Sequence, residues 1–188
     1  LYGCTIRMFE KVFKKFGIKT DYIDFTCKEN IKKILEISPT LIWLESPTNP
    51  LLKILDIKEI CSLASLQDIP VVVDNTFSTA ILQKPLELGA KLSIISTTKF
   101  INGHSDALGG AVLTNDEDWN KKMLFAQKAL GLQPSPFDCW LITRGLKTLP
   151  LRIEQQTKTA EKISNKLIDH KIIKTLIYPF HKVINNII

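Results

Sequence analysis

An acidic residue and a lysine each follow an apolar run near the middle of this sequence. Asp74 closes the run VVVD, and Lys99 lies in the hydroxyl-rich segment STTK, directly after the run LSII. If each run is a buried strand, the carboxylate and the amine both stand where a strand ends. A lysine amine can form a Schiff base with an aldehyde, and a carboxylate can keep a pyridine nitrogen protonated so that the ring accepts electrons. Together the two groups suit pyridoxal phosphate (PLP).

Two hydroxyl groups beside the lysine could donate hydrogen bonds to a cofactor phosphate, those of Ser96 and Thr98. Residue types alone also leave simpler interpretations open. An aspartate after three valines is often only a polar strand end, and a lysine among serine and threonine is often a solvated surface residue. The spacing by itself therefore indicates a PLP site as one of several possibilities.

The elements that must position these groups alternate between strand and helix. Apolar residues at helical spacing and N-cap signals predict helices, and Gly17 and Asp56 are a predicted helix stop and a predicted N-cap. The predicted helices span 6–16, 28–38, 56–66, 85–88 (one turn), 117–130, 136–147 and 151–169. The predicted strands span 20–25, 41–44, 70–74, 92–96, 109–114 and 172–177.

Most of these strands are continuously apolar, which predicts an α/β fold with a mostly parallel sheet sandwiched by helices. In such sheets, ligands gather at the carboxyl ends of the strands. Glu45 and Asn49 follow strand 41–44, just as Asp74 and the segment 96–99 follow their strands. Three separate strand ends therefore carry polar groups that a ligand could contact.

Composition excludes several classes of protein. The chain has 188 residues and 45% apolar content, and no apolar run approaches the ~18 residues of a membrane span. Its four cysteines are widely spaced and its three histidines lack metal-ligand spacing, which indicates a reduced, cytoplasmic protein without a metal. The net charge of +6 is spread over helix faces among acids, so we expect solvated surfaces and no nucleic-acid partner.

The stretch from 74 to 110 closely resembles the PLP-attachment region of the Cys/Met-metabolism (transsulfuration) enzymes. DNTF (74–77), QKPLELGA (83–90) and STTKFINGHSD (96–106) carry the resemblance. Lys91 stands where the family usually has aspartate, early in a strand, so we expect little chemical consequence. Further matching segments are YGCTIR (2–7), ESPTNP (45–50), PSPFDC (134–139) and RGLKTL (144–149).

The resemblance implies a PLP-dependent carbon–sulfur lyase with an aspartate-aminotransferase-like (fold type I) large domain. It implies that Lys99 is the Schiff-base lysine and the base that moves substrate protons. It implies that Asp74 binds the pyridine nitrogen, and that Ser96 and Thr98 bind the phosphate.

Residues of the earlier segments are implied to complete the site. Tyr2 would stack on the cofactor ring and help proton transfer, and Asn49 would reach the ring hydroxyl. Arg7 and Glu45 are weaker candidates for substrate binding. Simpler interpretations remain, since Tyr2 could be a packed aromatic and Glu45 a turn acid. Cys4 replaces a family glycine, which would strain a backbone that needs positive φ.

The family pattern also predicts the organisation of the chain. We expect 1–150 to be the PLP-binding portion of the large domain, incomplete at its N-terminal end, and 151–188 to be a connecting helix and the start of a small domain. Family members extend beyond both ends and form homotetramers, so we expect this chain alone to fold poorly and to be inactive. The tail after Pro179, FHKVINNII, departs from the family.

The expected substrate is a sulfur amino acid such as L-cystathionine. The spellings INGHSD and PSPFDC are closest to the gamma-lyase branch of the family. The gamma-synthase, beta-lyase and methionine gamma-lyase branches share the same motifs and stay open. So does a non-catalytic subunit that only associates with longer relatives.

Overall fold

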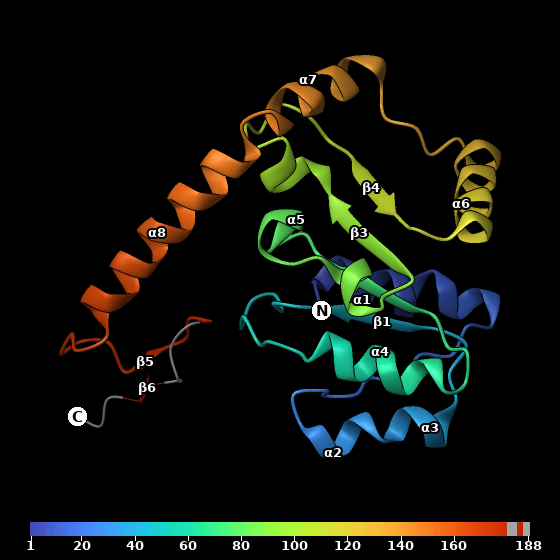
Figure 1. The fold of residues 1–188 in the computed structure, drawn as a ribbon, viewed down its shortest axis with the longest axis horizontal. Coiled ribbons are helices and arrows are strands. Elements are labelled where there is room, and N and C mark those ends of the chain that lie inside the picture. The colour runs from blue at the N-terminus through green and yellow to red at the C-terminus, as the bar shows by residue number, and fades with distance from the viewer. Residues whose placement is uncertain (180–183, 186–188) are drawn as a thin grey trace. The chain divides into compact units, whose positions relative to one another are not determined.

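A computed structural model describes residues 1–179 and 184–185, which form two compact units (Figure 1). Unit 1 contains Leu1–Asp74 and Pro85–Ser93, and unit 2 contains Asn75–Lys84 and the chain from Ile94 onward. Each unit buries its own cluster of apolar side chains.

Unit 1 begins with helix α1 (Gly3–Lys11) and the 3-10 turn η1 (Phe13–Phe16). Gly17 ends this segment at φ +80°, which glycine adopts without strain, so the predicted helix stop is confirmed. The predicted helix 28–38 is divided in two at Lys32. The remaining elements of unit 1 are α2 (Lys28–Ile31), α3 (Lys33–Ile37), β1 (Ile42–Glu45), α4 (Ile57–Ser65), β2 (Val71–Asp74) and η2 (Pro85–Leu88).

Helix α4 is held in unit 1 by its cap and by its apolar face. Asp56 Oδ1 accepts a hydrogen bond from Glu59 N at 2.9 Å, which confirms the predicted N-cap. Ile60 and Ala64 lie on the same face and are fully buried. They pack with the buried residues of β1 and β2 in one core cluster.

Unit 2 carries the elements that follow β2. These are α5 (Thr79–Leu82), most of β3 (Leu92–Ser96), the π-helical turn η3 (Thr97–Ile101), β4 (Gly110–Leu113), α6 (Glu117–Leu130), α7 (Pro136–Leu146), α8 (Leu149–Leu167), β5 (Thr175–Leu176) and β6 (Ile184–Asn185). Its core cluster consists of Ile95, Ile101, Leu149 and Ile153. The core therefore joins the strand and turn that precede and follow Lys99 to the start of helix α8.

The central sheet has the strand order β1-β2-β3-β4. Strands β1 and β2 are parallel, with Ile42 opposite Val71 and Glu45 opposite Asp74. The carboxyl ends of these two strands therefore coincide. The predicted α/β fold with a mostly parallel sheet is confirmed, and strands β1 to β4 lie within one or two residues of their predicted positions.

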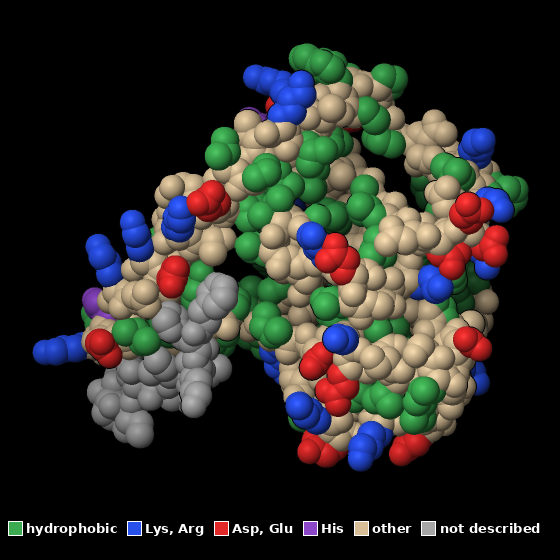
Figure 2. All heavy atoms as spheres, in the orientation of Figure 1, with side chains coloured by type: hydrophobic (Ala, Val, Ile, Leu, Met, Phe, Trp, Pro, Cys, Tyr) green, Lys and Arg blue, Asp and Glu red, His purple; other side chains and the backbone are tan. Residues whose placement is uncertain are grey.

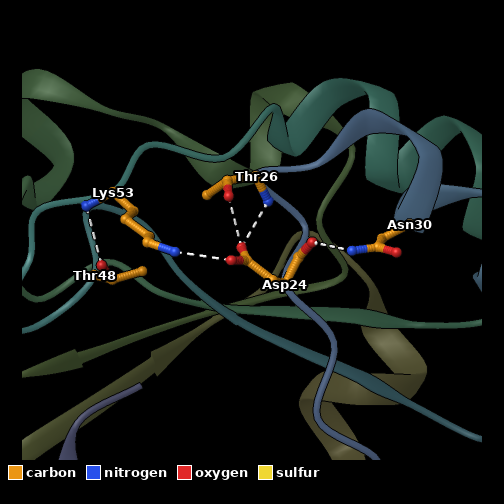
Figure 3. A network of polar contacts seen from close by, with 5 residues as sticks. All are labelled: Asp24, Thr26, Asn30, Thr48 and Lys53. Atoms are coloured by element: carbon orange, nitrogen blue, oxygen red, sulfur yellow. Dashed lines mark hydrogen bonds and ion pairs between the residues drawn. The ribbon is translucent and has the colours of Figure 1, made fainter. Parts of the chain in front are cut away.

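The prediction of a strand at 20–25 is wrong, because these residues belong to neither a helix nor a strand. Asp24 turns the chain there instead. Its Oδ1 accepts hydrogen bonds from Thr26 N at 3.1 Å and from Thr26 Oγ1 at 2.7 Å, and its carbonyl accepts from Asn30 Nδ2 at 2.9 Å (Figure 3). A side chain that bonds the backbone two residues on competes with sheet pairing.

Asp24 also joins this turn to the loop after β1. Lys53 Nζ lies 2.8 Å from Asp24 Oδ2, and Lys53 N donates to Thr48 Oγ1 at 3.0 Å (Figure 3). The Thr48 N–H in turn donates to the Lys53 carbonyl at 3.0 Å. The loop that contains Asn49 is thereby closed by contacts at both ends.

We expect replacement of Asp24 by asparagine to remove a small pH dependence of stability. The hydrogen bond from Lys53, followed by those from Thr26, holds the pKa of Asp24 well below its usual range. A depressed folded pKa gives stability that is complete above the unfolded value of about 3.9 and is lost as pH falls toward the folded value. The effect is small because the pair is exposed.

Urea titrations between about pH 7 and pH 3 test this expectation. The difference in unfolding free energy between wild type and Asp24→Asn should narrow as the pH falls below about 4. Asp21→Asn is the control, because Asp21 has no hydrogen bond or ion pair among the described residues. A difference that stays constant down to the lowest pH would contradict the prediction.

The last predicted strand, 172–177, is reduced to β5, which pairs antiparallel with β6. The departing tail lies in part outside the described residues, since 180–183 and 186–188 are not described. Helix α8 ends at Leu167, close to its predicted end.

Charged side chains of the described residues are spread along the helices and are not gathered in one patch. Figure 2 shows basic and acidic side chains mixed along helix α8. One pair on this helix is Lys158 and Glu154, with Nζ and Oε1 2.6 Å apart. Within the part of the chain that the structure describes, no helix is long and apolar enough to cross a membrane.

Candidate active site

Lys99 lies in the turn directly after strand β3. It interrupts the π-helical segment η3 with a non-helical backbone, φ −90° and ψ −120°. Its side chain is exposed, and within the described residues its Nζ has no hydrogen bond or ion pair. Single π-helical turns are frequent at functional sites. The exposed amine is therefore available to form a covalent bond.

The two hydroxyl candidates beside Lys99 differ in their contacts. Ser96 N donates to Thr76 Oγ1 at 2.9 Å, while Ser96 Oγ has no partner among the described residues. The Thr98 hydroxyl is already engaged, since it donates to Gly109 O at 3.3 Å and accepts from Gly109 N at 2.9 Å. Ser96 can thus bind an anion directly, whereas Thr98 must first release the carbonyl of Gly109.

Two residues that the sequence did not single out hold the loop after β2. Asn75 is 1% exposed, and its Nδ2 donates to Gln83 O at 2.8 Å. Gln83 Nε2 donates back to Asn75 Oδ1 at 2.9 Å. Asn75 N also donates to Ile94 O at 2.8 Å, in strand β3. The only signal in the sequence was that both residues belong to the matched spellings DNTF and QKPLELGA.

In unit 1, Glu45 connects two of the predicted residues at the end of β1. Its side chain is buried, at 5% exposure. Its Oε2 accepts a hydrogen bond from Tyr2 N, and its Oε1 accepts one from Asn49 N at 3.0 Å. Because both oxygens accept from backbone donors, this carboxylate positions Tyr2 and Asn49. The sequence predicted these three residues but not this connection between them.

The electrostatics of Glu45 reflect its position opposite Asp74 in the sheet. Burial raises the pKa of Glu45, and the Asp74 carboxylate adds to the increase. The hydrogen bonds from the backbone N–H groups of Tyr2 and Asn49 act in the opposite direction. Asp74 itself is partly buried at the carboxyl end of β2.

Tyr2 and Arg7 lie on either side of Cys4 in the chain. The Tyr2 side chain is 45% exposed. Its hydrogen bond to the Cys4 thiol is the main cause that raises the pKa of Tyr2. Arg7 Nη2 lies 2.9 Å from Cys4 Sγ. Cys4 lies inside helix α1 without positive φ, so it does not cause the backbone strain considered from the sequence.

The predicted residues thus form one group in each unit. In unit 1, Glu45 brings Tyr2 and Asn49 together, and strand pairing places Asp74 opposite Glu45. In unit 2, the turn after β3 brings together the residues 96–99.

A cavity of about 1270 Å³ lies in unit 1 beside strand β1. Glu45 and Asn49 line part of it, together with residues of α1, of β1 and of the segment 17–26. Trp43 Nε1 is buried there and has no hydrogen-bond partner among the described residues. Asp74 does not line this cavity, so it is not the centre of the predicted chemistry. Among the described residues, no cluster of His, Cys, Asp and Glu could hold a metal ion.

Residues 1–185 match a family model described as "Cys/Met metabolism PLP-dependent enzyme". The chain is 42% identical to a "Probable cystathionine gamma-synthase" of Herpetosiphon aurantiacus, over 95% of this chain and 56% of that protein. It is also 42% identical to the "Cystathionine gamma-lyase" of Dictyostelium discoideum, over 95% of this chain and 46% of that protein. The chain therefore spans about half the length of these relatives.

Solved structures of similar enzymes also match this chain. The crystal structure of metB from Corynebacterium glutamicum matches with a TM-score of 0.93 and 42% identity, over 96% of this chain and 47% of that one. Apo CalE6, a methionine gamma lyase from Micromonospora echinospora, matches with a TM-score of 0.92 and 38% identity, over 95% of this chain and 49% of that one. The similarity includes both units, since it covers nearly all of this chain.

Proposed function

Because the chain belongs to the Cys/Met metabolism PLP-dependent enzyme family, we propose that it carries the cofactor-holding part of a carbon–sulfur lyase of transsulfuration. The observation that supports this proposal is Lys99. Its exposed amine has no partner among the described residues and lies in an irregular turn at the carboxyl end of β3. A lysine that only faces solvent could lie in a regular helix, without the non-helical backbone found at Lys99.

The donor groups of the predicted residues suit PLP. Lys99 would hold the cofactor aldehyde, and Ser96 Oγ, with the Thr98 hydroxyl once it turns, would donate to the phosphate. Asp74 would pair with the ring nitrogen. When bound, PLP supplies an electron sink that stabilises negative charge at the substrate α carbon.

Residues of unit 1 would contact the rest of the cofactor ring. Tyr2 would stack on it, and Asn49 would reach its hydroxyl. Glu45 would keep both at the end of β1 through its two backbone hydrogen bonds. Arg7, exposed on α1, is a weaker candidate for contact with the substrate.

In the reaction, the Lys99 amine would take the α proton of the amino-acid substrate, release it, and then take a proton from the β carbon, so that the electron pair of that C–H bond forms a double bond to the γ carbon. A sulfur bonded to the γ carbon could then leave. Tyr2 would help the proton transfers, because its hydroxyl can donate or accept a proton.

Within the family we propose the cystathionine gamma-lyase reaction, which yields cysteine, 2-oxobutanoate and ammonia. The spellings INGHSD and PSPFDC support this choice. The relatives include gamma-synthase, gamma-lyase and beta-lyase names at 41–42% identity, so sequence identity does not separate these reactions. An assay with cystathionine separates the two lyase reactions, because the beta-lyase reaction releases pyruvate and the gamma-lyase reaction releases 2-oxobutanoate. We further propose that the protein is cytoplasmic and that it forms a homotetramer. Sedimentation would test the homotetramer.

The experiment that tests the proposal locates the bound cofactor. The purified chain is mixed with PLP, reduced with borohydride and digested, and the modified peptide is identified by mass spectrometry. We expect the modification at Lys99 at one equivalent of PLP. Modification spread over many surface lysines, with no preference for Lys99, would overturn the proposal.

A further inference from the structure

One arginine outside the predicted site, Arg152, contacts the turn that carries Lys99. It lies near the start of helix α8 and is partly buried. Its Nη1 donates to Phe100 O at 2.7 Å, and its Nη2 donates to Ile101 O at 3.1 Å. These are the carbonyls of the two residues that directly follow Lys99. The guanidinium therefore holds the backbone on the C-terminal side of the reactive lysine.

The same guanidinium is anchored on the opposite side by helix α7 and its end. Nη2 also donates to Gly145 O at 2.8 Å, and Nε donates to Thr148 Oγ1 at 3.0 Å. The Thr148 hydroxyl in turn donates to Gly145 O at 3.2 Å. Arg152 thus joins the Lys99 turn to the junction of α7 and α8, more than forty residues later in the chain.

Two glycines make the space for this contact. A Cβ at Gly103 would lie 2.2 Å from Arg152 Nη1, and a Cβ at Gly145 would lie 2.1 Å from Asn102 O. Gly103 has φ +73°, which also favours glycine. Asn102 is fully buried, and its N donates to Thr97 O at 2.9 Å across the turn. The turn is therefore packed directly against helix α7 and the arginine.

The chemistry of the contact requires arginine. Carbonyls at the end of a helical segment lack partners within the segment, so another group must donate to them. A guanidinium presents several N–H donors in a rigid plane and can serve three carbonyls and a hydroxyl at once. A lysine ammonium is a single point of charge and cannot reproduce this spacing.

We propose that Arg152 is a positioning residue for Lys99, holding the turn after β3 so that the lysine amine stays at the cofactor site. The assignment rests on the proposed function for the identity of that cofactor. The contact geometry does not depend on PLP, because every bond involved lies within unit 2. The positioning of the Lys99 turn and the binding of PLP can therefore be tested separately.

Amide hydrogen exchange tests the positioning without the cofactor. The amides of Asn102 and Gly103 close the turn, donating to Thr97 O at 2.9 Å and to Lys99 O at 2.8 Å. In Arg152→Met we expect these amides to exchange about ten- to a hundredfold faster, because charge-assisted hydrogen bonds are among the stronger ones. Arg152→Lys should restore little of the protection. Peptides from helix α6 should be unchanged.

Arg144→Met is the matched control. Arg144 lies in helix α7, is exposed, and its side chain has no hydrogen bond or ion pair among the described residues. The Arg144→Met substitution removes the same charge from the same region but leaves the contacts of the Lys99 turn in place. If the amides of Asn102 and Gly103 exchange at equal rates in Arg152→Met and Arg144→Met, the proposal is overturned.

Attachment of PLP supplies the second readout. We expect Arg152→Met to reduce the fraction of Lys99 modified after borohydride reduction at least about tenfold, with Arg144→Met near wild type. If Arg152→Met does not fold, Thr148→Val keeps the guanidinium but removes the acceptor of Nε and the hydroxyl that donates to Gly145 O, and it should still speed amide exchange at Asn102. Unchanged exchange there would refute the proposal. If wild type binds no PLP, the proposed function fails, while the exchange data still decide the positioning.

Discussion

Replacement of Lys99 by alanine is expected to abolish covalent attachment of PLP and to leave the fold intact. The amine is the only part of the side chain that the proposed chemistry uses, and alanine offers no group to bond the cofactor aldehyde. The exposed side chain makes no hydrogen bond or ion pair among the described residues, so its loss should change stability by only about 0.5 kcal/mol or less.

Two measurements on the same sample check this expectation. The visible absorbance of bound PLP should be absent from Lys99→Ala, and the urea midpoint should match that of wild type. Lys58→Ala is the control, because Lys58 is an exposed lysine on helix α4 with no side-chain partner among the described residues. An unaltered absorbance band in Lys99→Ala would exclude Lys99 as the attachment site.

Replacement of Gly145 by alanine is expected to destabilise unit 2 by about 1–3 kcal/mol. Inside a helix, alanine is ordinarily favoured over glycine by about 1 kcal/mol. Here the added Cβ would lie 2.1 Å from the carbonyl oxygen of Asn102 and 2.9 Å from its carbonyl carbon. These are backbone atoms of a fully buried residue, so they cannot rotate away as a flexible side chain could. The steric cost should therefore exceed the gain in helix propensity.

Urea titration and PLP attachment measure the two consequences of this change. The shift of Asn102 needed to relieve the clash should also move the Lys99 turn and reduce PLP attachment. Gly3→Ala is the matched control for stability, because Gly3 is helical and no atom lies within 4 Å of its added Cβ. Alanine at Gly3 should be neutral or slightly stabilising. A Gly145→Ala chain as stable as Gly3→Ala would contradict the close approach of α7 to the turn.

Local patterns were sufficient to locate most elements and the residues at strand ends. The runs around Asp74 and Lys99 are short, apolar and bounded by polar residues, and these features act within a few residues of the chain. Helices α6 and α7 begin after Asp116 and Ser135, whose side chains accept backbone N–H hydrogen bonds in the structure. The segment 20–25 was misassigned because the side chain of Asp24 bonds Thr26 and replaces strand pairing.

Long-range contacts explain what the sequence could not reveal. Arg152 lies in an amphipathic helix, and nothing in its neighbours distinguishes it from a solvated arginine. Its partners Phe100 and Ile101 are about fifty residues earlier in the chain, so only folding brings them within hydrogen-bond distance. Glu45 was an equally ambiguous turn acid until its burial and its two backbone donors were visible.

The sequence alone determined most of the strands and helices and placed an amine and a carboxylate at strand ends, because propensity, capping and periodicity are local properties. Tertiary structure alone decided which groups hold those residues in place. Glu45 binds the backbone of Tyr2 and Asn49, and Arg152 docks the turn of Lys99 against α7. Such contacts depend on packing between distant segments, and packing has no periodic signature in a single sequence.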